Sequence, residues 1–187
     1  MGLAIFAAAV ALNFIDWDRY KGPIVAHLSK ELGHQLSVDG DIALSVFPYP
    51  SFSLTGVRIA NVEGANRKDM VRLKSLDVQV AFMPLITGVI EVRKIVLIEP
   101  NILFERLSDG RTNWTAFGSG LNENNVESSN TFPRITFSKV RIENGSLTFL
   151  DGVNGTSEHI DEIELTISAP RLDGPFDFSG MLKFRGG

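Results

Sequence analysis

The feature that most constrains this chain is an alternation of apolar and polar residues with a period of two. Strict alternation covers 38–46, 76–82 and 163–167. Side chains of a β-strand point alternately to opposite faces, so this period predicts half-buried strands. Apolar runs bounded by glycine, asparagine or proline predict further strands at 53–62, 89–98, 102–107, 135–142, 146–151 and 176–184. Short links between these runs favour antiparallel neighbours.

A short helix is predicted before the first strand, over residues 16–36. Its apolar residues recur at every fourth position and form one stripe, made of Tyr20, Ile24, Leu28, Leu32 and Leu36. Gly33 suits the left-handed position after a helix, whereas Pro23 predicts a kink or a helix start at Gly22-Pro23. We expect the stripe to pack on the neighbouring sheet.

The most apolar run of the chain lies at its start, in residues 3–15, where Asn13 is the only polar residue. A helix of this length spans roughly 20 Å, and a bilayer core is about 30 Å thick. Three interpretations compete: a truncated transmembrane anchor, the apolar region of a signal peptide, or a buried helix of a soluble protein. No Lys or Arg precedes the run, although a signal peptide and a complete anchor would both usually carry one there. The position of the run at the extreme N-terminus favours the truncated anchor.

Composition argues against several kinds of function. The chain has no cysteine, which excludes disulfides, thiolate metal sites and cysteine nucleophiles. Its net charge of −4 argues against a nucleic-acid binder. Phosphate-binding loops and nucleophile elbows are missing from the sequence, and the three histidines are not at metal-ligand spacing. We therefore expect no catalytic residue, no metal and no cofactor, and a function that is not enzymatic.

The predicted strands expose more apolar surface than one helix covers. A helix is about 10 Å wide and strands lie about 4.8 Å apart, so it covers roughly two strands. The other apolar faces either close on each other as a sandwich or barrel, or stay open and hold an apolar ligand. The residues expected to face inward, as core or as lining, are Leu76, Val78, Val80, Phe82, Ile90, Val92, Ile102, Phe104, Leu147, Phe149, Ile163, Leu165 and Ile167.

A polar, aperiodic segment at 118–131 divides the β region into units at 37–117 and 132–187. Residues 98–104 (IEPNILF) resemble 142–149 (IENGSLTF) with one residue inserted, which indicates a repeated β-hairpin unit with a tight turn. The predicted organisation is an anchor (1–15), a short helix (16–36), a first β unit, a linker and a second, incomplete β unit.

Five stretches, in order along the chain, resemble the AsmA family. They are 16–21 (DWDRYK), 40–48 (GDIALSVFP), 57–61 (VRIAN), 109–114 (DGRTNW), and 140–151 (VRIENGSLTFLD) with 168–175 (SAPRLDGP) after it. Gly22-Pro23 and the missing basic flank before the apolar run depart from the family pattern. Because family members continue well beyond residue 187, the chain resembles an N-terminal fragment.

The resemblance implies a location and a role. AsmA-like proteins are held in the inner membrane of Gram-negative bacteria by one helix, with the body in the periplasm, and are linked to outer-membrane biogenesis and to regulation of protein targeting to membranes. They are similar to TamB and the chorein-type proteins, which implies an elongated antiparallel β groove for phospholipid transport in place of a closed sandwich or barrel. The expected partners are membrane phospholipid, the inner membrane and envelope proteins. The alternative role is a scaffold for assembly or targeting of proteins to the membrane.

Overall fold

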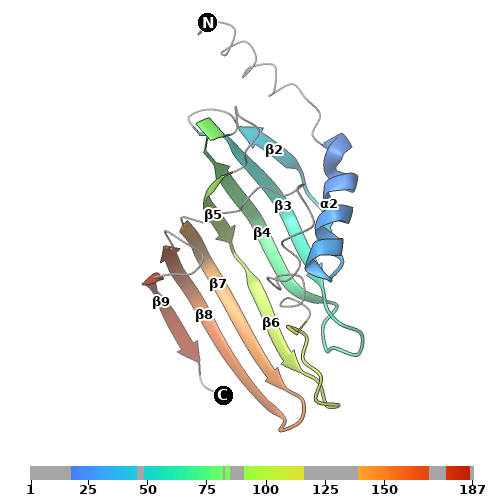
Figure 1. Cartoon of the computed structure of the whole chain (residues 1–187). Helices are drawn as coiled ribbons and strands as arrows, with labels where there is room; N and C mark the ends of the chain where they lie inside the picture. Colours follow the sequence, from blue (N-terminus) through green and yellow to red (C-terminus); the bar gives the residue numbers. More distant parts are fainter. Residues whose placement is uncertain are drawn as a thin grey trace, which may run out of the picture.

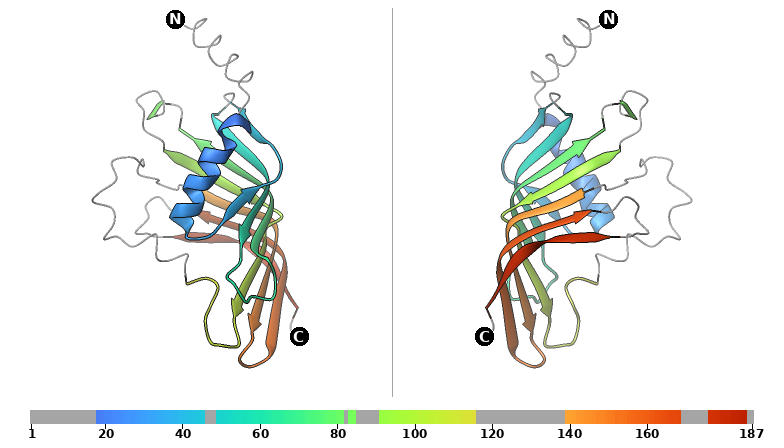
Figure 2. Two further views of the ribbon diagram at one scale, coloured as in Figure 1. Left: turned by 90° about the vertical axis from the view of Figure 1, so that its right-hand side faces the viewer. Right: turned by 90° about the vertical axis from the view of Figure 1, so that its left-hand side faces the viewer.

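A computed structural model describes residues 18–45, 49–81, 83–84, 91–115, 139–168 and 176–185. These residues form a single curved sheet with one short helix, α2, beside it (Figures 1 and 2). The elements are α2 (Asp18–Leu32), β1 (Leu36–Val38), β2 (Ile42–Ser45), β3 (Ser51–Ala60), β4 (Asp69–Val80), β5 (Val92–Ile98), β6 (Asn101–Arg106), β7 (Lys139–Asp151), β8 (Thr156–Ser168) and β9 (Asp177–Arg185). The prediction of a mainly β chain with a short helix is confirmed.

The sheet is mixed, with the order β1-β3-β4-β5-β7-β8-β9. β2 also pairs with β3, and β6 pairs with both β4 and β7. β7 runs parallel to β5 and β6, whereas the other pairs are antiparallel. The prediction of a purely antiparallel groove is therefore wrong at this place. Short links favour antiparallel neighbours, but two parallel strands need a longer crossover connection between them. The prediction from short links did not consider such a connection between β6 and β7.

The two similar segments lie side by side and are not separate hairpins. Asn101 is the partner of Ser146, and Phe104 is the partner of Phe149. The predicted tight turns at Glu99 and Asn144 are wrong, because the chain passes through both without reversing. Each residue has a positive φ, 49° at Glu99 and 52° at Asn144, as in a bulge that bends a strand. The similarity in sequence thus marks two parallel strands that bend at the same level of the sheet.

α2 ends four residues before the predicted helix does. Gly33 follows it with a φ of 68°, which confirms the predicted left-handed position, and Pro23 lies inside the helix. The helix is tied to the first strands by Lys21 Nζ, which donates to the Gly40 carbonyl (2.5 Å), and by the Leu36 N–H, which donates to Ser29 Oγ (2.8 Å). α2 therefore lies over the β1–β3 side of the sheet, as the left view of Figure 2 shows.

Among the described residues, no helix is long and apolar enough to cross a bilayer. The predicted anchor (1–15) and the predicted linker (118–131) lie outside the described residues. The predicted strands are present with different bounds. The alternating run 38–46 is split into β1 and β2 at Asp39–Asp41, and the ranges 135–142 and 146–151 belong to one strand, β7, which begins at Lys139.

Gly40, in the stretch that separates β1 from β2, lies against Thr55 of β3. The Gly40 N–H donates to the Thr55 carbonyl (3.1 Å), and the Asp41 N–H donates to Thr55 Oγ1 (2.8 Å). A Cβ at Gly40 would overlap the Thr55 side chain and lie 3.0 Å from its carbonyl oxygen. Glycine is required here because the stretch between β1 and β2 closely approaches β3.

Gly40→Ala is expected to lower the free energy of unfolding by about 1–3 kcal/mol, because an added methyl group in a tightly packed position forces backbone shifts. Urea denaturation measures this. The matched control is Gly22→Ala, where no heavy atom lies within 4 Å of the added Cβ and a change of about 0.5 kcal/mol is expected. A Gly40→Ala variant as stable as the parent would contradict the close approach.

Candidate functional site

An apolar cavity of about 740 Å³ lies between α2 and the sheet. Every side chain that lines it is aliphatic or aromatic. They are Val25, Leu28 and Leu32 of α2, with Leu36, Val38, Leu54, Val57, Ile59, Met70, Val71, Leu73, Leu76, Ile95, Leu97, Ile102, Phe104 and Trp114. Protein interiors rarely contain voids much larger than a water molecule. This volume falls instead in the range of small-molecule sites.

The register of the sheet extends the cavity's apolar lining across the strands. Residues that are cross-strand partners share a face of the sheet. One row of partners runs Leu54, Leu76, Leu97, Ile142 and Leu165, and a second runs Phe52, Val78, Ile95, Val140, Ile167 and Phe178. We call this apolar face, together with the cavity under α2, the groove.

A change of alternation within β3 and β4 lets both strands line the cavity over most of their length. Leu54 and Val57 both line the cavity, although residues three apart in a regular strand face opposite sides. Gly56 lies between them with a φ of 63°, a conformation that glycine adopts without strain. On β4, Leu73 and Leu76 show the same spacing of three. Both strands thus present apolar residues to the groove on either side of this irregularity.

The residues predicted to face inward fall into four groups. Leu76, Ile102 and Phe104 line the cavity. Val80 and Val92 are cross-strand partners on β4 and β5, and both are buried, with 2% and 6% of their surface exposed. Half-buried positions on the groove face are occupied by Val78, Leu147, Phe149, Ile163, Leu165 and Ile167. Phe82 and Ile90 lie outside the described residues.

Sequence reasoning missed the first half of β4 and most of β3 as lining. Met70, Val71 and Leu73 line the cavity, but the segment 69–75 (DMVRLKS) does not alternate strictly and predicted no strand. The apolar residues of 69–73 were the signal that would have found it. On α2, Val25 lines the cavity although it lies off the predicted stripe.

Trp114 forms part of the groove wall. Its ring lies edge-on to Phe104, with centroids 5.7 Å apart, and is tilted against Phe149 at 6.1 Å. Edge-to-face contacts of this kind are favourable beyond the area they bury. Because Phe104 and Phe149 are partners on β6 and β7, the indole spans two parallel strands.

Asn113, one residue before Trp114, is fully buried (0% exposed) and holds the turn to β6. Its Nδ2 donates to the Leu103 carbonyl (2.8 Å) and to Asn61 Oδ1 (3.1 Å), and its Oδ1 accepts the Glu105 N–H (2.9 Å). The side chain thus satisfies buried backbone groups that would otherwise stay unpaired. We assign the segment 109–114 a positioning role in the groove wall.

Asp109 closes the same turn. The Arg111 N–H donates to Asp109 Oδ1 (3.0 Å), and Arg111 Nε donates to Oδ2 (2.7 Å). These bonds, first the backbone one and then the guanidinium one, hold the pKa of the Asp109 carboxyl below its usual value. The turn is therefore held by a carboxylate that remains ionised to lower pH than a free aspartate.

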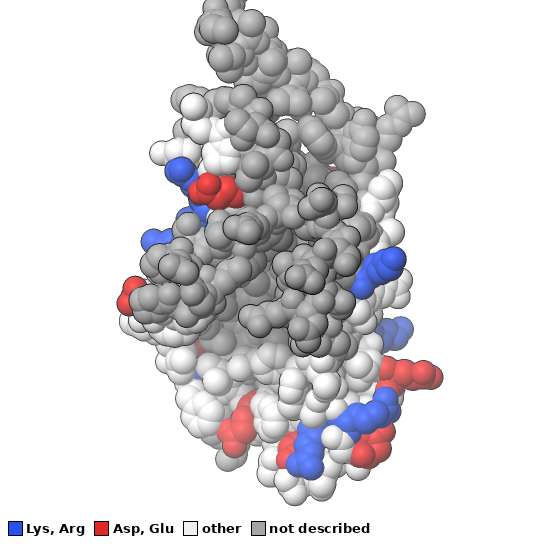
Figure 3. Space-filling model, viewed as in Figure 1, with Lys and Arg blue, Asp and Glu red and all other residues white. Residues whose placement is uncertain are grey.

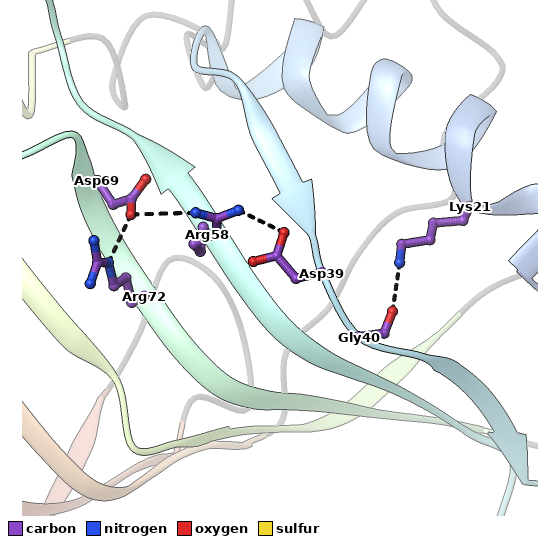
Figure 4. A network of polar contacts seen from close by, with 6 residues as sticks. All are labelled: Lys21, Asp39, Gly40, Arg58, Asp69 and Arg72. Atoms are coloured by element: carbon purple, nitrogen blue, oxygen red, sulfur yellow. Dashed lines mark hydrogen bonds and ion pairs between the residues drawn. The ribbon is translucent and has the colours of Figure 1, made fainter.

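Charged side chains lie on the face opposite the groove. Arg58 Nη2 lies 2.7 Å from Asp39 Oδ1, Arg58 Nη1 lies 4.0 Å from Asp69, and Arg72 Nε lies 2.7 Å from Asp69 Oδ2 (Figure 4). The hydrogen bond with Asp39 raises the pKa of Arg58 above its ordinary value. Exposed pairs contribute little stability, so this network chiefly orients its members. Figure 3 shows described charges of both signs near the lower end of that view.

A Thr-His-Asp arrangement lies on β7 and β8. Thr148 Oγ1 lies 3.0 Å from His159 Nδ1, and His159 Nε2 lies 2.8 Å from Asp161 Oδ1. Thr148 is 5% exposed and is the cross-strand partner of His159. A nucleophile must reach its substrate, so we interpret these contacts as structural. Within the described ranges, no group of three or more metal-ligating side chains is gathered for an ion.

Comparison with known proteins places the chain in context. The model of the AsmA family matches residues 2–186. The AsmA family protein YhjG of Escherichia coli K12 is 23% identical over 196 residues, which cover 98% of this chain. The match covers 28% of the length of YhjG, so this chain corresponds to less than a third of that relative.

Proposed function

The chain belongs to the AsmA family, and we propose that it is an inner-membrane-anchored periplasmic protein that carries phospholipid in its groove during outer-membrane biogenesis. The observation that carries this proposal is the apolar cavity of about 740 Å³ under α2. Anchoring by residues 1–15 and the periplasmic location are part of the proposal. Family membership is consistent with a role in the bacterial envelope.

The energetics of lipid transfer favour such a groove. A bare phospholipid in water exposes about 30 methylenes at about 0.8 kcal/mol each, which amounts to roughly 24 kcal/mol. A carrier must replace that water with apolar surface along the route. The groove face offers such surface from β3 to β9, where Phe178, Leu182 and Phe184 remain 58–66% exposed. These side chains continue the apolar rows to the last described strand.

The alternative function is a scaffold for assembly or targeting of proteins to the membrane. If the protein is a scaffold, the apolar residues of the groove serve only as a hydrophobic core, and its function does not depend on bound lipid. Filling the cavity with protein atoms would then leave function unchanged. The two functions are therefore separated by a variant that occupies the cavity without weakening the fold.

Leu28→Trp on α2 is such a variant, because Leu28 lines the cavity and is 37% exposed. The larger ring adds apolar volume inside the groove, so we expect the variant to keep its thermal stability and to lose most of its bound lipid. Lipid is measured by mass spectrometry of the purified chain and by transfer between vesicles. Ala26→Trp is the matched control, because Ala26 is exposed and does not line the cavity.

Lipid on the parent and on the Ala26→Trp variant, with little on Leu28→Trp, supports the proposal. No lipid on the parent and no transfer between vesicles would contradict it. Equal lipid on all three proteins would place the binding site elsewhere and would also contradict it.

A further inference from the structure

A second hollow, of about 540 Å³, lies on the sheet face opposite the groove. Arg67, Lys68, Asp69, Arg72 and Asn101 line it. Arg72 and Asn101 are partners across β4 and β6, and so are the next residues, Val71 and Ile102, which line the groove. Since successive strand residues face opposite sides, the two cavities are separated by the sheet.

The lining of this hollow is positively charged within an acidic chain. It holds three cations and one carboxylate, whereas the whole chain carries a net charge of −4. The single carboxylate, Asp69, is already paired with Arg72 (2.7 Å) and lies 4.0 Å from Arg58 (Figure 4). The excess of positive charge therefore attracts an anion.

The loop that carries Arg67 and Lys68 is fixed on both sides. The Glu105 carboxylate, 2% exposed, accepts hydrogen bonds from the Asn66 N–H (3.0 Å) and from Asn66 Nδ2 (2.6 Å). The Lys68 carbonyl accepts the Asn61 N–H (2.8 Å). A buried carboxylate thus holds the backbone next to Arg67, so an anion need not order the loop when it binds.

We propose that this hollow binds a phosphate oxyanion, presented either by the headgroup of an anionic phospholipid or by a free phosphate ester. The planar guanidinium matches the geometry of phosphate oxygens. Arg72 gives its Nε–H to Asp69 and keeps the N–H donors of its two terminal nitrogens. This site is distinct from the groove, and its function does not depend on lipid in the groove.

Titration calorimetry of the purified chain with glycerol 3-phosphate and with inorganic phosphate tests the proposal. A second arm measures binding to phosphatidylcholine vesicles with and without phosphatidylglycerol. We expect saturable binding that weakens about tenfold or more in Arg67→Gln and in the double variant Arg67→Gln/Arg72→Gln, since each change removes a charge-assisted hydrogen bond. Arg141→Gln is the control, because Arg141 is paired with Glu143 on β7.

Binding of the soluble esters alone assigns the site to a free phosphate compound. Binding of phosphatidylglycerol vesicles with the same sensitivity to Arg67 assigns it to a lipid headgroup. Absence of saturable binding by the parent, or binding by the double variant equal to that of Arg141→Gln, would overturn the proposal. Because Arg67 is exposed, loss of folding is not expected, and a thermal melt of each variant checks this.

Discussion

Asn113→Ala is expected to lower the free energy of unfolding by about 3 kcal/mol. The substitution leaves the Leu103 carbonyl and the Glu105 N–H without their partner in a fully buried place, and each unsatisfied buried group costs about 1–3 kcal/mol. The change also removes the support of Trp114 against Phe104. We therefore expect urea denaturation to show the loss and tryptophan fluorescence to shift toward that of a more exposed indole.

Asn154→Ala is the matched control for Asn113. Asn154 Nδ2 donates to Asp151 Oδ2 (2.7 Å) in the turn between β7 and β8, and the side chain is exposed. A loss of no more than about 1 kcal/mol is expected there. If Asn113→Ala destabilises the chain no more than Asn154→Ala does, the buried network does not hold the segment 109–114.

Leu76→Asp is expected to lower lipid binding by more than about a hundredfold while the chain still folds. Leu76 lines the cavity at half-buried depth. An ionised carboxylate at this position must lose its water when an acyl chain enters, at a cost of several kcal/mol. Because position 76 is only half-buried, we expect water to reach the same carboxylate in the unliganded groove. Lipid co-purification measured together with circular dichroism separates the two effects.

Two variants control for Leu76→Asp. Gln79→Asp adds the same carboxylate to the same strand on the opposite face, and it is expected to keep its lipid. Leu76→Ala removes the same half-buried side chain, which costs about 2 kcal/mol of stability in either variant, but it keeps the lining apolar, so lipid is retained. Equal loss of lipid in Leu76→Asp and Gln79→Asp would show that the groove face is not where lipid binds.

Local periodicity predicted most of the fold. The period of two identified strands at β2, in the second half of β4 and at β8, and Gly33 marked the end of α2, because alternation and helix termination depend on neighbouring residues. The relation between Ile98–Phe104 and Ile142–Phe149 was also visible in the sequence. The structural meaning of this similarity could not be predicted, because a repeated pattern does not show whether two strands lie in separate hairpins or side by side.

The groove required information that a sequence pattern lacks. Its lining changes alternation at Gly56, so a strict period of two assigns Leu54 and Val57 to opposite faces. The parallel pairing of β6 with β7 depends on a crossover, and the burial of Asn113 depends on contacts with Asn61, 52 residues away in the chain. Such long-range contacts set which apolar positions become lining and which become core.

Photocrosslinking with a phospholipid that carries a diazirine near the end of one acyl chain identifies the residues that contact the acyl chain. After irradiation and digestion, peptide mass spectrometry locates the modified residues. We expect labels at groove residues of α2, β4 and β5, such as Leu28, Leu76 and Ile95, and loss of those labels in the Leu28→Trp variant. Labels confined to the opposite face, around Arg58 and Gln79, would contradict a lipid-binding groove.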